Sequence, residues 1–142
     1  MKIYPAERIA LIGLELFMGV LAVVCGFILM VGQAEDIMSM HVDVLEGSPF
    51  RSFTLPGIIL ALAVGGSQLV AAYGMWRHET WEIAASIAAG LILMGWIAGE
   101  IALLGWIAPK FLQPFCFLYG AAIAGVALCH ARASTPPETT TG

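Results

Sequence analysis

Charged residues are scarce in this chain of 142 residues, since Asp, Glu, Lys and Arg together make up only 11% of it. An ordinary soluble domain carries roughly 25% charged residues, and a much smaller share cannot cover a surface that faces water. Apolar residues, by contrast, account for 60% of the sequence. The composition therefore argues against a soluble domain and favours a protein of the lipid bilayer.

Clustered positive charge is also lacking. Six Lys and Arg stand against ten Asp and Glu, which gives a formal net charge of −4, and the cations occur singly along the chain. Nucleic-acid binding depends on grouped Lys and Arg side chains that contact phosphates. We therefore expect no nucleic-acid partner.

Cysteine and histidine motifs are missing too. The cysteines lie in apolar runs without the two-residue spacing of redox or zinc sites, and we interpret all three as packing residues: Cys25, Cys116 and Cys129. Haem between helices needs histidines within facing apolar segments. His41 lies in a loop, whereas His78 and His130 lie at helix ends, where we interpret them as cytoplasmic surface residues.

The usual signatures of enzymes do not occur either. The sequence contains no glycine-rich phosphate loop, no nucleophile elbow and no histidine–carboxylate metal cluster. We therefore expect no cofactor, no bound metal and no catalytic residue, which predicts a non-enzymatic protein.

Four apolar runs are long enough to cross a bilayer. A spanning helix needs about 20 apolar residues, because each adds about 1.5 Å against a hydrocarbon layer about 30 Å thick. The sequence predicts an all-α, polytopic membrane protein, a four-transmembrane-helix bundle forming one domain over 1–132, with helices at about 9–31, 55–76, 81–106 and 113–130. The stretch 133–142 is rich in Thr and Pro, which predicts a disordered tail.

Orientation follows from the cations, because Lys and Arg are retained preferentially on the cytoplasmic side. On one predicted side lie Lys2, Arg8, Arg77 and Arg132, and on the other lie Arg51 and Lys110. This bias places both termini in the cytoplasm. A cleaved signal peptide over the first run is the rival interpretation, but Glu15 would have no evident use in a disposable leader.

The first loop contains a segment, 36–45, that fits two conformations. Its apolar residues share one helical face, which favours a short helix lying at the membrane interface. Alternation of Met40, Val42 and Val44 suits an extended segment equally well. Both alternatives stay open from the sequence.

Two acidic residues, Glu15 and Glu100, lie within apolar runs, where a charge costs about 2.5 to 3.5 kcal/mol. Counting residues from the predicted helix ends places Ser67 and Gln68 at the level of Glu15, and Tyr119 at the level of Glu100. One hypothesis is therefore two buried polar stations, each holding its proton much of the time because hydrocarbon disfavours the charged form. The alternative is that both glutamates only join helices by hydrogen bonds.

Small residues recur every four positions on three of the predicted helices. The repeats are Gly57, Ala61 and Gly65 on the second, Gly95 and Gly99 on the third, and Ala121 and Gly125 on the fourth. Such stripes let helix backbones approach closely. They indicate packing within the bundle or a face for self-association, and the sequence does not separate the two.

One short sequence pattern begins before the predicted second helix and continues into it: Gly47-Ser48-Pro49-Phe50, then Phe53, Pro56-Gly57 and Gly65-Gly66-Ser67. This pattern resembles small, uncharacterised bacterial four-helix membrane proteins, over roughly 9–130. The resemblance implies the same fold and a place in the inner membrane of a bacterium, and it carries no established activity.

Glu15 is also similar in position to the proton-exchanging glutamate in the first helix of small multidrug-resistance transporters. Here, however, a long first loop replaces a compact one, the chain is longer, and the aromatic pattern around the substrate is not evident. We therefore treat this likeness as coincidental.

These patterns favour a non-enzymatic integral membrane protein that acts as a homo-oligomer or as an accessory subunit of a larger membrane complex. The alternative is a small proton-coupled permease that uses Glu15, with Glu100 as a second station. An enzyme acting on lipids is a third hypothesis, for which no nucleophile can be named.

Overall fold

The computed structural model describes residues 6–32, 51–105 and 111–134, together with Asp43, Glu46 and Pro49. The conformation predicted for 36–45 lies outside these residues, apart from one backbone hydrogen bond from Glu46 N to Asp43 O of 3.1 Å. The predicted tail also lies outside them, except that its first two residues belong to the last helix.

Four long helices make up the described part of the chain, and no strand occurs within it. Helix α1 spans Ala6–Met30, and α5 and α6 span Glu82–Leu104 and Leu112–Ser134. The second long helix is continuous over Thr54–Arg77 and consists of α3 (Thr54–Ile59), η2 (Leu60–Gly65) and α4 (Gly66–Arg77). The all-α fold with four long helices is thus confirmed, with ends a few residues from those predicted.

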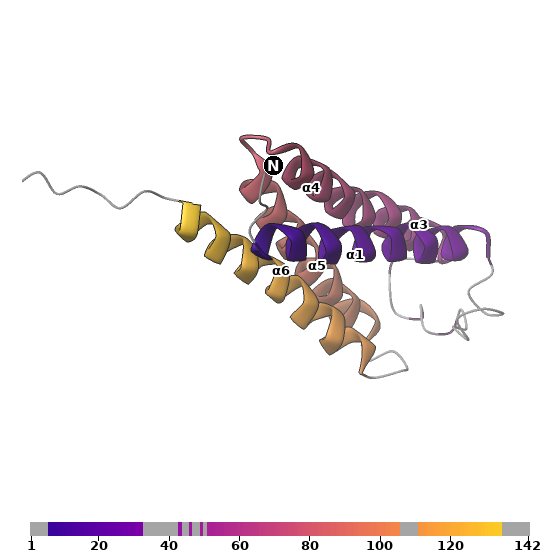
Figure 1. The fold of residues 1–142 in the computed structure, drawn as a ribbon. Helices are drawn as coiled ribbons and strands as arrows, with labels where there is room; N and C mark the ends of the chain where they lie inside the picture. Colours follow the sequence, from indigo (N-terminus) through magenta and orange to yellow (C-terminus); the bar gives the residue numbers. More distant parts are fainter. Residues whose placement is uncertain are drawn as a thin grey trace, which may run out of the picture.

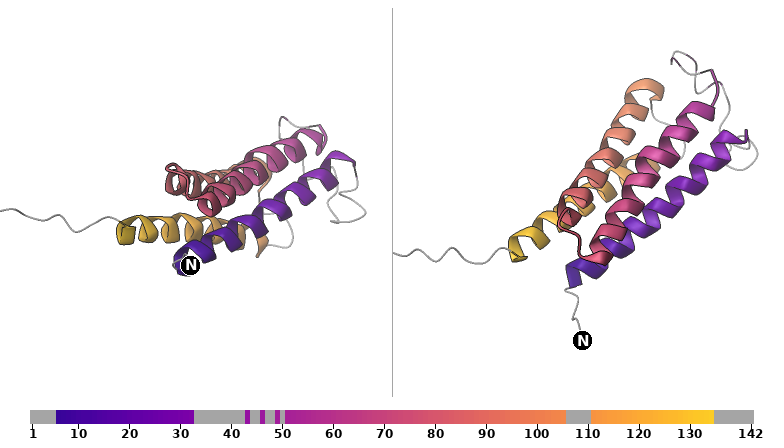
Figure 2. Two further views of the ribbon diagram at one scale, coloured as in Figure 1. Left: turned by 45° about the horizontal axis from the view of Figure 1, so that its top comes forward. Right: turned by 90° about the horizontal axis from the view of Figure 1, so that it is seen from above.

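The helices form two antiparallel pairs that cross at an angle (Figure 1). Helix α1 packs along α3, η2 and α4, and α5 packs along most of α6. Contacts of α4 with α5 and of α1 with α6 join the two pairs. Figure 2 shows both pairs from two further directions.

Glycine pairs let the helices within each pair approach closely. A Cβ atom on Gly26 would lie 2.6 Å from the carbonyl oxygen of Gly57, and one on Gly90 would lie 2.6 Å from that of Gly120. Only a residue without a Cβ fits at such distances, so these glycines set the spacing of α1 with α3 and of α5 with α6.

The segment η2 is a π-helical stretch in the middle of the second long helix. At its end the N–H of Gly66 reaches back to the carbonyl of Ala61, five residues earlier. Such stretches are uncommon and occur often at functional sites. This one ends just before Gln68, so it helps to set the direction in which that side chain leaves the helix.

The outside of the bundle is apolar and its centre holds polar groups. More than half of the surface of several large apolar side chains is exposed, among them Phe17, Leu62, Trp76 and Leu118. A smaller set of side chains forms two buried clusters around Val64 and Ile123. By length and composition all four helices could cross a membrane.

Candidate functional site

Three polar side chains lie fully buried at the centre of the bundle. Glu15 comes from α1, Gln68 from α4 and Ser86 from α5, and each is 0% exposed. Ser86 lies beside the Glu15 carboxyl group. Gln68 approaches α1 one turn beyond Glu15, where a Cβ on Gly19 would lie 3.3 Å from the Gln68 Cβ. We call these three residues the central polar cluster.

The amide of Gln68 has a fixed orientation. Its Nε2 donates a hydrogen bond of 3.1 Å to the carbonyl oxygen of Ala89 on α5. Since a carbonyl oxygen only accepts, the amide nitrogen must face Ala89, and Gln68 Oε1 is left as an acceptor.

Four oxygen atoms of the central polar cluster have no hydrogen-bond partner among the described residues. They are Glu15 Oε1, Glu15 Oε2, Gln68 Oε1 and Ser86 Oγ. Buried polar atoms in proteins are nearly always hydrogen-bonded, because leaving one unpaired costs about 1 to 3 kcal/mol. Four unpaired oxygens at the centre of the bundle are therefore unusual.

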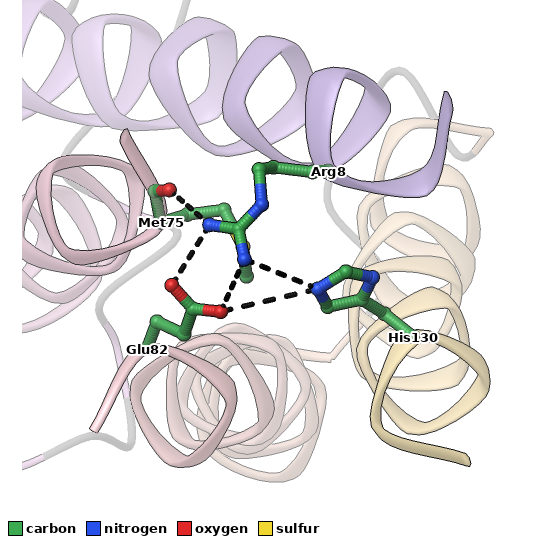
Figure 3. Close-up of polar contacts among 4 residues, drawn as sticks. All are labelled: Arg8, Met75, Glu82 and His130. Atoms are coloured by element: carbon green, nitrogen blue, oxygen red, sulfur yellow. Dashed lines mark hydrogen bonds and ion pairs between the residues drawn. The ribbon is translucent and has the colours of Figure 1, made fainter. Parts of the chain in front are cut away.

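A second polar group, drawn in Figure 3, lies near the start of α1 and consists of Arg8, Met75, Glu82 and His130. Arg8 donates from Nη1 to Glu82 Oε2 at 2.8 Å and from Nη2 to Glu82 Oε1 at 2.6 Å. Nη1 also donates to the carbonyl oxygen of Met75. His130 Nε2 lies 3.4 Å from Arg8 Nη2 and 3.9 Å from Glu82 Oε1. We call these residues the terminal network.

The terminal network joins all four long helices, because its members come from α1, α4, α5 and α6. His130 Nε2 lies near both charged partners, Arg8 Nη2 and Glu82 Oε1, so α6 contacts the ion pair as a whole. The two charged side chains neutralise each other in a bidentate pair, which is the arrangement a buried ion pair requires.

One histidine prediction is wrong. His130 is buried, with 3% of its surface exposed, because α6 passes over α5 where Glu82 begins that helix. His78 lies on the surface as expected, at the end of α4, with a left-handed φ of 56°.

The first predicted station forms only in part. Gln68 faces the bundle centre as Glu15 does, but the Ser67 hydroxyl donates to Val64 O of its own helix at 3.0 Å. Ser86 takes the place expected for Ser67. It is the only hydroxyl-bearing residue in Glu82–Leu104. A single hydroxyl in an otherwise apolar helix was the feature of the sequence that could have pointed to Ser86.

The second predicted station does not include Tyr119. Its hydroxyl donates to Leu14 O at 2.8 Å, one residue before Glu15, and so ties α6 to α1. Beside the half-buried Glu100 lie Trp96 and Gln113.

The small-residue stripes differ in their surroundings. On the second long helix, Gly57, Ala61 and Gly65 lie against α1. A Cβ placed on three other glycines would meet no atom within 4 Å: Gly95, Gly99 and Gly125. Ala121 is half-buried on α6. The close contact between α5 and α6 uses Gly90 and Gly120, which the stripes did not single out.

In the described part of the chain no three His, Cys, Asp or Glu residues are grouped so as to hold a metal ion. Comparison with protein-family models, with curated proteins and with solved structures finds no match. The chemistry of the site therefore has to be argued from its own atoms.

Proposed function

We propose that the chain is a multi-pass protein of the bacterial inner membrane, with both termini in the cytoplasm. We further propose that it is a non-enzymatic, proton-coupled permease in which Glu15 exchanges the proton. The membrane location and the orientation rest on the four apolar helices, on their exposed apolar side chains and on the bias of the cations. The bacterial inner membrane rests on the resemblance of the sequence to small bacterial four-helix membrane proteins.

The observation that carries the permease proposal is the unpaired state of the Glu15 carboxyl group. A glutamate that only joined helices would gain its stabilising energy from hydrogen bonds to neighbouring helices. Glu15 is 0% exposed, and neither of its oxygens has such a bond among the described residues. Buried ionisable groups inside membrane segments commonly mark paths of protons or substrates.

In this proposal the terminal network closes the bundle between the cytoplasmic side and the central polar cluster. Glu82 precedes Ser86 by four residues, so the network lies about 6 Å along α5 from the central polar cluster. Its contacts hold four helices together on the side we assign to the cytoplasm. A solute or proton entering from that side has to pass it.

The experiment is carboxyl infrared difference spectroscopy of the protein reconstituted in lipid bilayers, recorded between about pH 6 and 9, the range expected for buried carboxyl groups in proton-coupled sites. The account expects a titrating carboxyl band that Glu15→Gln removes and that Glu100→Gln, the matched control, leaves in place. Absence of any Glu15 band over this range would overturn the permease proposal.

A second candidate function, assembly with other copies or with a larger membrane complex, is favoured by one observation. Gly95, Gly99 and Gly125 have open space where a Cβ would be, so these parts of α5 and α6 could admit another helix backbone. Crosslinking in native membranes tests this candidate. A strictly monomeric protein that captures no partner would rule it out.

A further inference from the structure

We propose that the central polar cluster binds one small alkali-metal cation, with Na⁺ as the reference ion, in exchange for the proton of Glu15. This inference rests on the proposed proton exchange and names the ion that competes with the proton. In the exchange the Glu15 O–H bond breaks, the proton leaves to solvent, and the carboxylate oxygens bind the cation, so charge balances.

The donor set of the cluster consists of oxygen atoms alone. Two belong to the Glu15 carboxyl group, one is the amide oxygen of Gln68 and one is the hydroxyl of Ser86. The Gln68 nitrogen is engaged by Ala89 O, so it does not enter the set. Carboxylate, carbonyl and hydroxyl oxygens suit hard cations rather than thiophilic metals.

Charge selects a monovalent ion. The cluster holds one carboxylate, so a single positive charge neutralises it, whereas a divalent cation would leave a net charge of +1 in hydrocarbon. Arg8 does not fill this role, because it precedes Glu15 by seven residues, about 10 Å along α1, and it is paired with Glu82.

The oxygens of the three side chains are left without partners at the centre of the bundle. Protonated Glu15 and Ser86 would each bring one O–H donor, enough to pair with each other and with Gln68 Oε1. None of the four oxygens has a partner at good hydrogen-bond geometry, although Ser86 lies beside the Glu15 carboxyl group and all three side chains are fully buried. The tie from Gln68 to Ala89 and the close approach at Gly19 keep α4 in its place. A small cation bound by all four oxygens fits this arrangement.

Other titratable or charged groups on the packed helices do not replace Glu15 as the competing group. Besides the exposed Tyr73, Arg77, Cys129 and Arg132 and the half-buried Glu7, Cys25 and Cys116, they are Arg8 on α1, Glu82 and Glu100 on α5, and Tyr119 and His130 on α6. Arg8 and Glu82 are paired with each other, and His130 lies beside that pair. The Tyr119 hydroxyl donates to Leu14 O. Glu100 follows Ser86 by fourteen residues, about 21 Å along α5.

The test uses the purified full-length protein in a weakly buffered solution with a pH indicator. NaCl is added in one arm and choline chloride at equal ionic strength in the other. We expect Na⁺ to release protons saturably, approaching one per chain, and choline to release none. Glu15→Gln should abolish the release.

Two serine variants make the assignment specific. Ser86→Ala removes an oxygen of the cluster and should raise the Na⁺ concentration for half-release by about tenfold or more, the size of effect typical of groups that support a metal site. Ser67→Ala is the matched control, because that hydroxyl bonds Val64 O, and it should leave the release unchanged. A rise in unfolding temperature with NaCl over choline chloride provides an independent readout of binding.

The failures of the two proposals can be told apart. If the Glu15 carboxyl band titrates with pH but Na⁺ and choline act alike, cation binding is overturned and proton exchange stands. Equal responses of Ser86→Ala and Ser67→Ala would also overturn the cation site. If the carboxyl band does not titrate at all, the proposed function fails and this inference fails with it.

Discussion

Arg8 and Glu82 are 74 positions apart in the chain, yet their side chains meet in a bidentate ion pair with N···O distances of 2.6 and 2.8 Å. The pair joins the first turn of α1 to the first residue of α5. It is buried, so the stability of this end of the bundle depends on both partners being present.

Replacing Arg8 by Met should destabilise the protein by about 3 to 5 kcal/mol, because the buried Glu82 carboxylate loses its partner. The double variant Arg8→Met with Glu82→Leu should regain much of this loss, since neither charge is then buried. Unfolding in mixed micelles measures both effects. Arg77→Met, which removes an exposed arginine, is the control, and an equal loss in that variant would contradict the role assigned to Arg8.

Gly90→Ala should destabilise the pairing of α5 with α6 by about 1 to 3 kcal/mol, because the added methyl group overpacks the contact with Gly120. Gly95→Ala, on the same helix, meets no atom within 4 Å and should have little effect on folding. Unfolding free energies of the two variants should therefore differ. Equal values would mean that the close approach at Gly90 does not occur.

Tyr119→Phe should cost about 1 kcal/mol, since it removes one hydrogen bond to Leu14 O and leaves the ring in place. The control is Tyr73→Phe, which changes a tyrosine whose surface is 51% exposed. Stability measurements on both variants test whether α6 is tied to α1 next to Glu15. A neutral Tyr119→Phe would argue against that tie.

The proposed orientation predicts that both ends of the chain face the cytoplasm. A fluorescent reporter that matures only in the cytoplasm should fluoresce when fused to either terminus. A reporter active only outside the inner membrane should stay inactive at both positions. Opposite results for the two termini would contradict an even number of membrane crossings.

The helices could be predicted closely because length and apolarity alone decide them. Each apolar run had to supply about 20 residues, and prolines and charged residues bounded it. The ends of α1 and α6 differ from prediction by three or four residues, which matters little for the fold. Helix ends do not decide side-chain partners, and the Tyr119 hydroxyl bonds Leu14 O on α1 rather than joining Glu100.

The polar contacts could be predicted only in part, because each residue turns a helix by about 100° and small errors in phase change the face. Gln68 faces the centre as expected, but its neighbour Ser67 turns back to Val64 O. The π-helical stretch before them also changes the direction in which later side chains leave the helix, and no residue pattern predicted that stretch. Contacts between distant helices, such as that of Arg8 with Glu82, left no local signal in the sequence.

The most direct test of the account is the carboxyl infrared difference spectrum of Glu15 in reconstituted bilayers, compared between the natural protein and Glu15→Gln. The account predicts a carboxyl band that changes between about pH 6 and 9, the range expected for a proton-exchanging buried carboxyl group, and that disappears in Glu15→Gln but persists in Glu100→Gln. A spectrum without a Glu15 band over this range would contradict proton exchange at Glu15 and leave that residue a structural role.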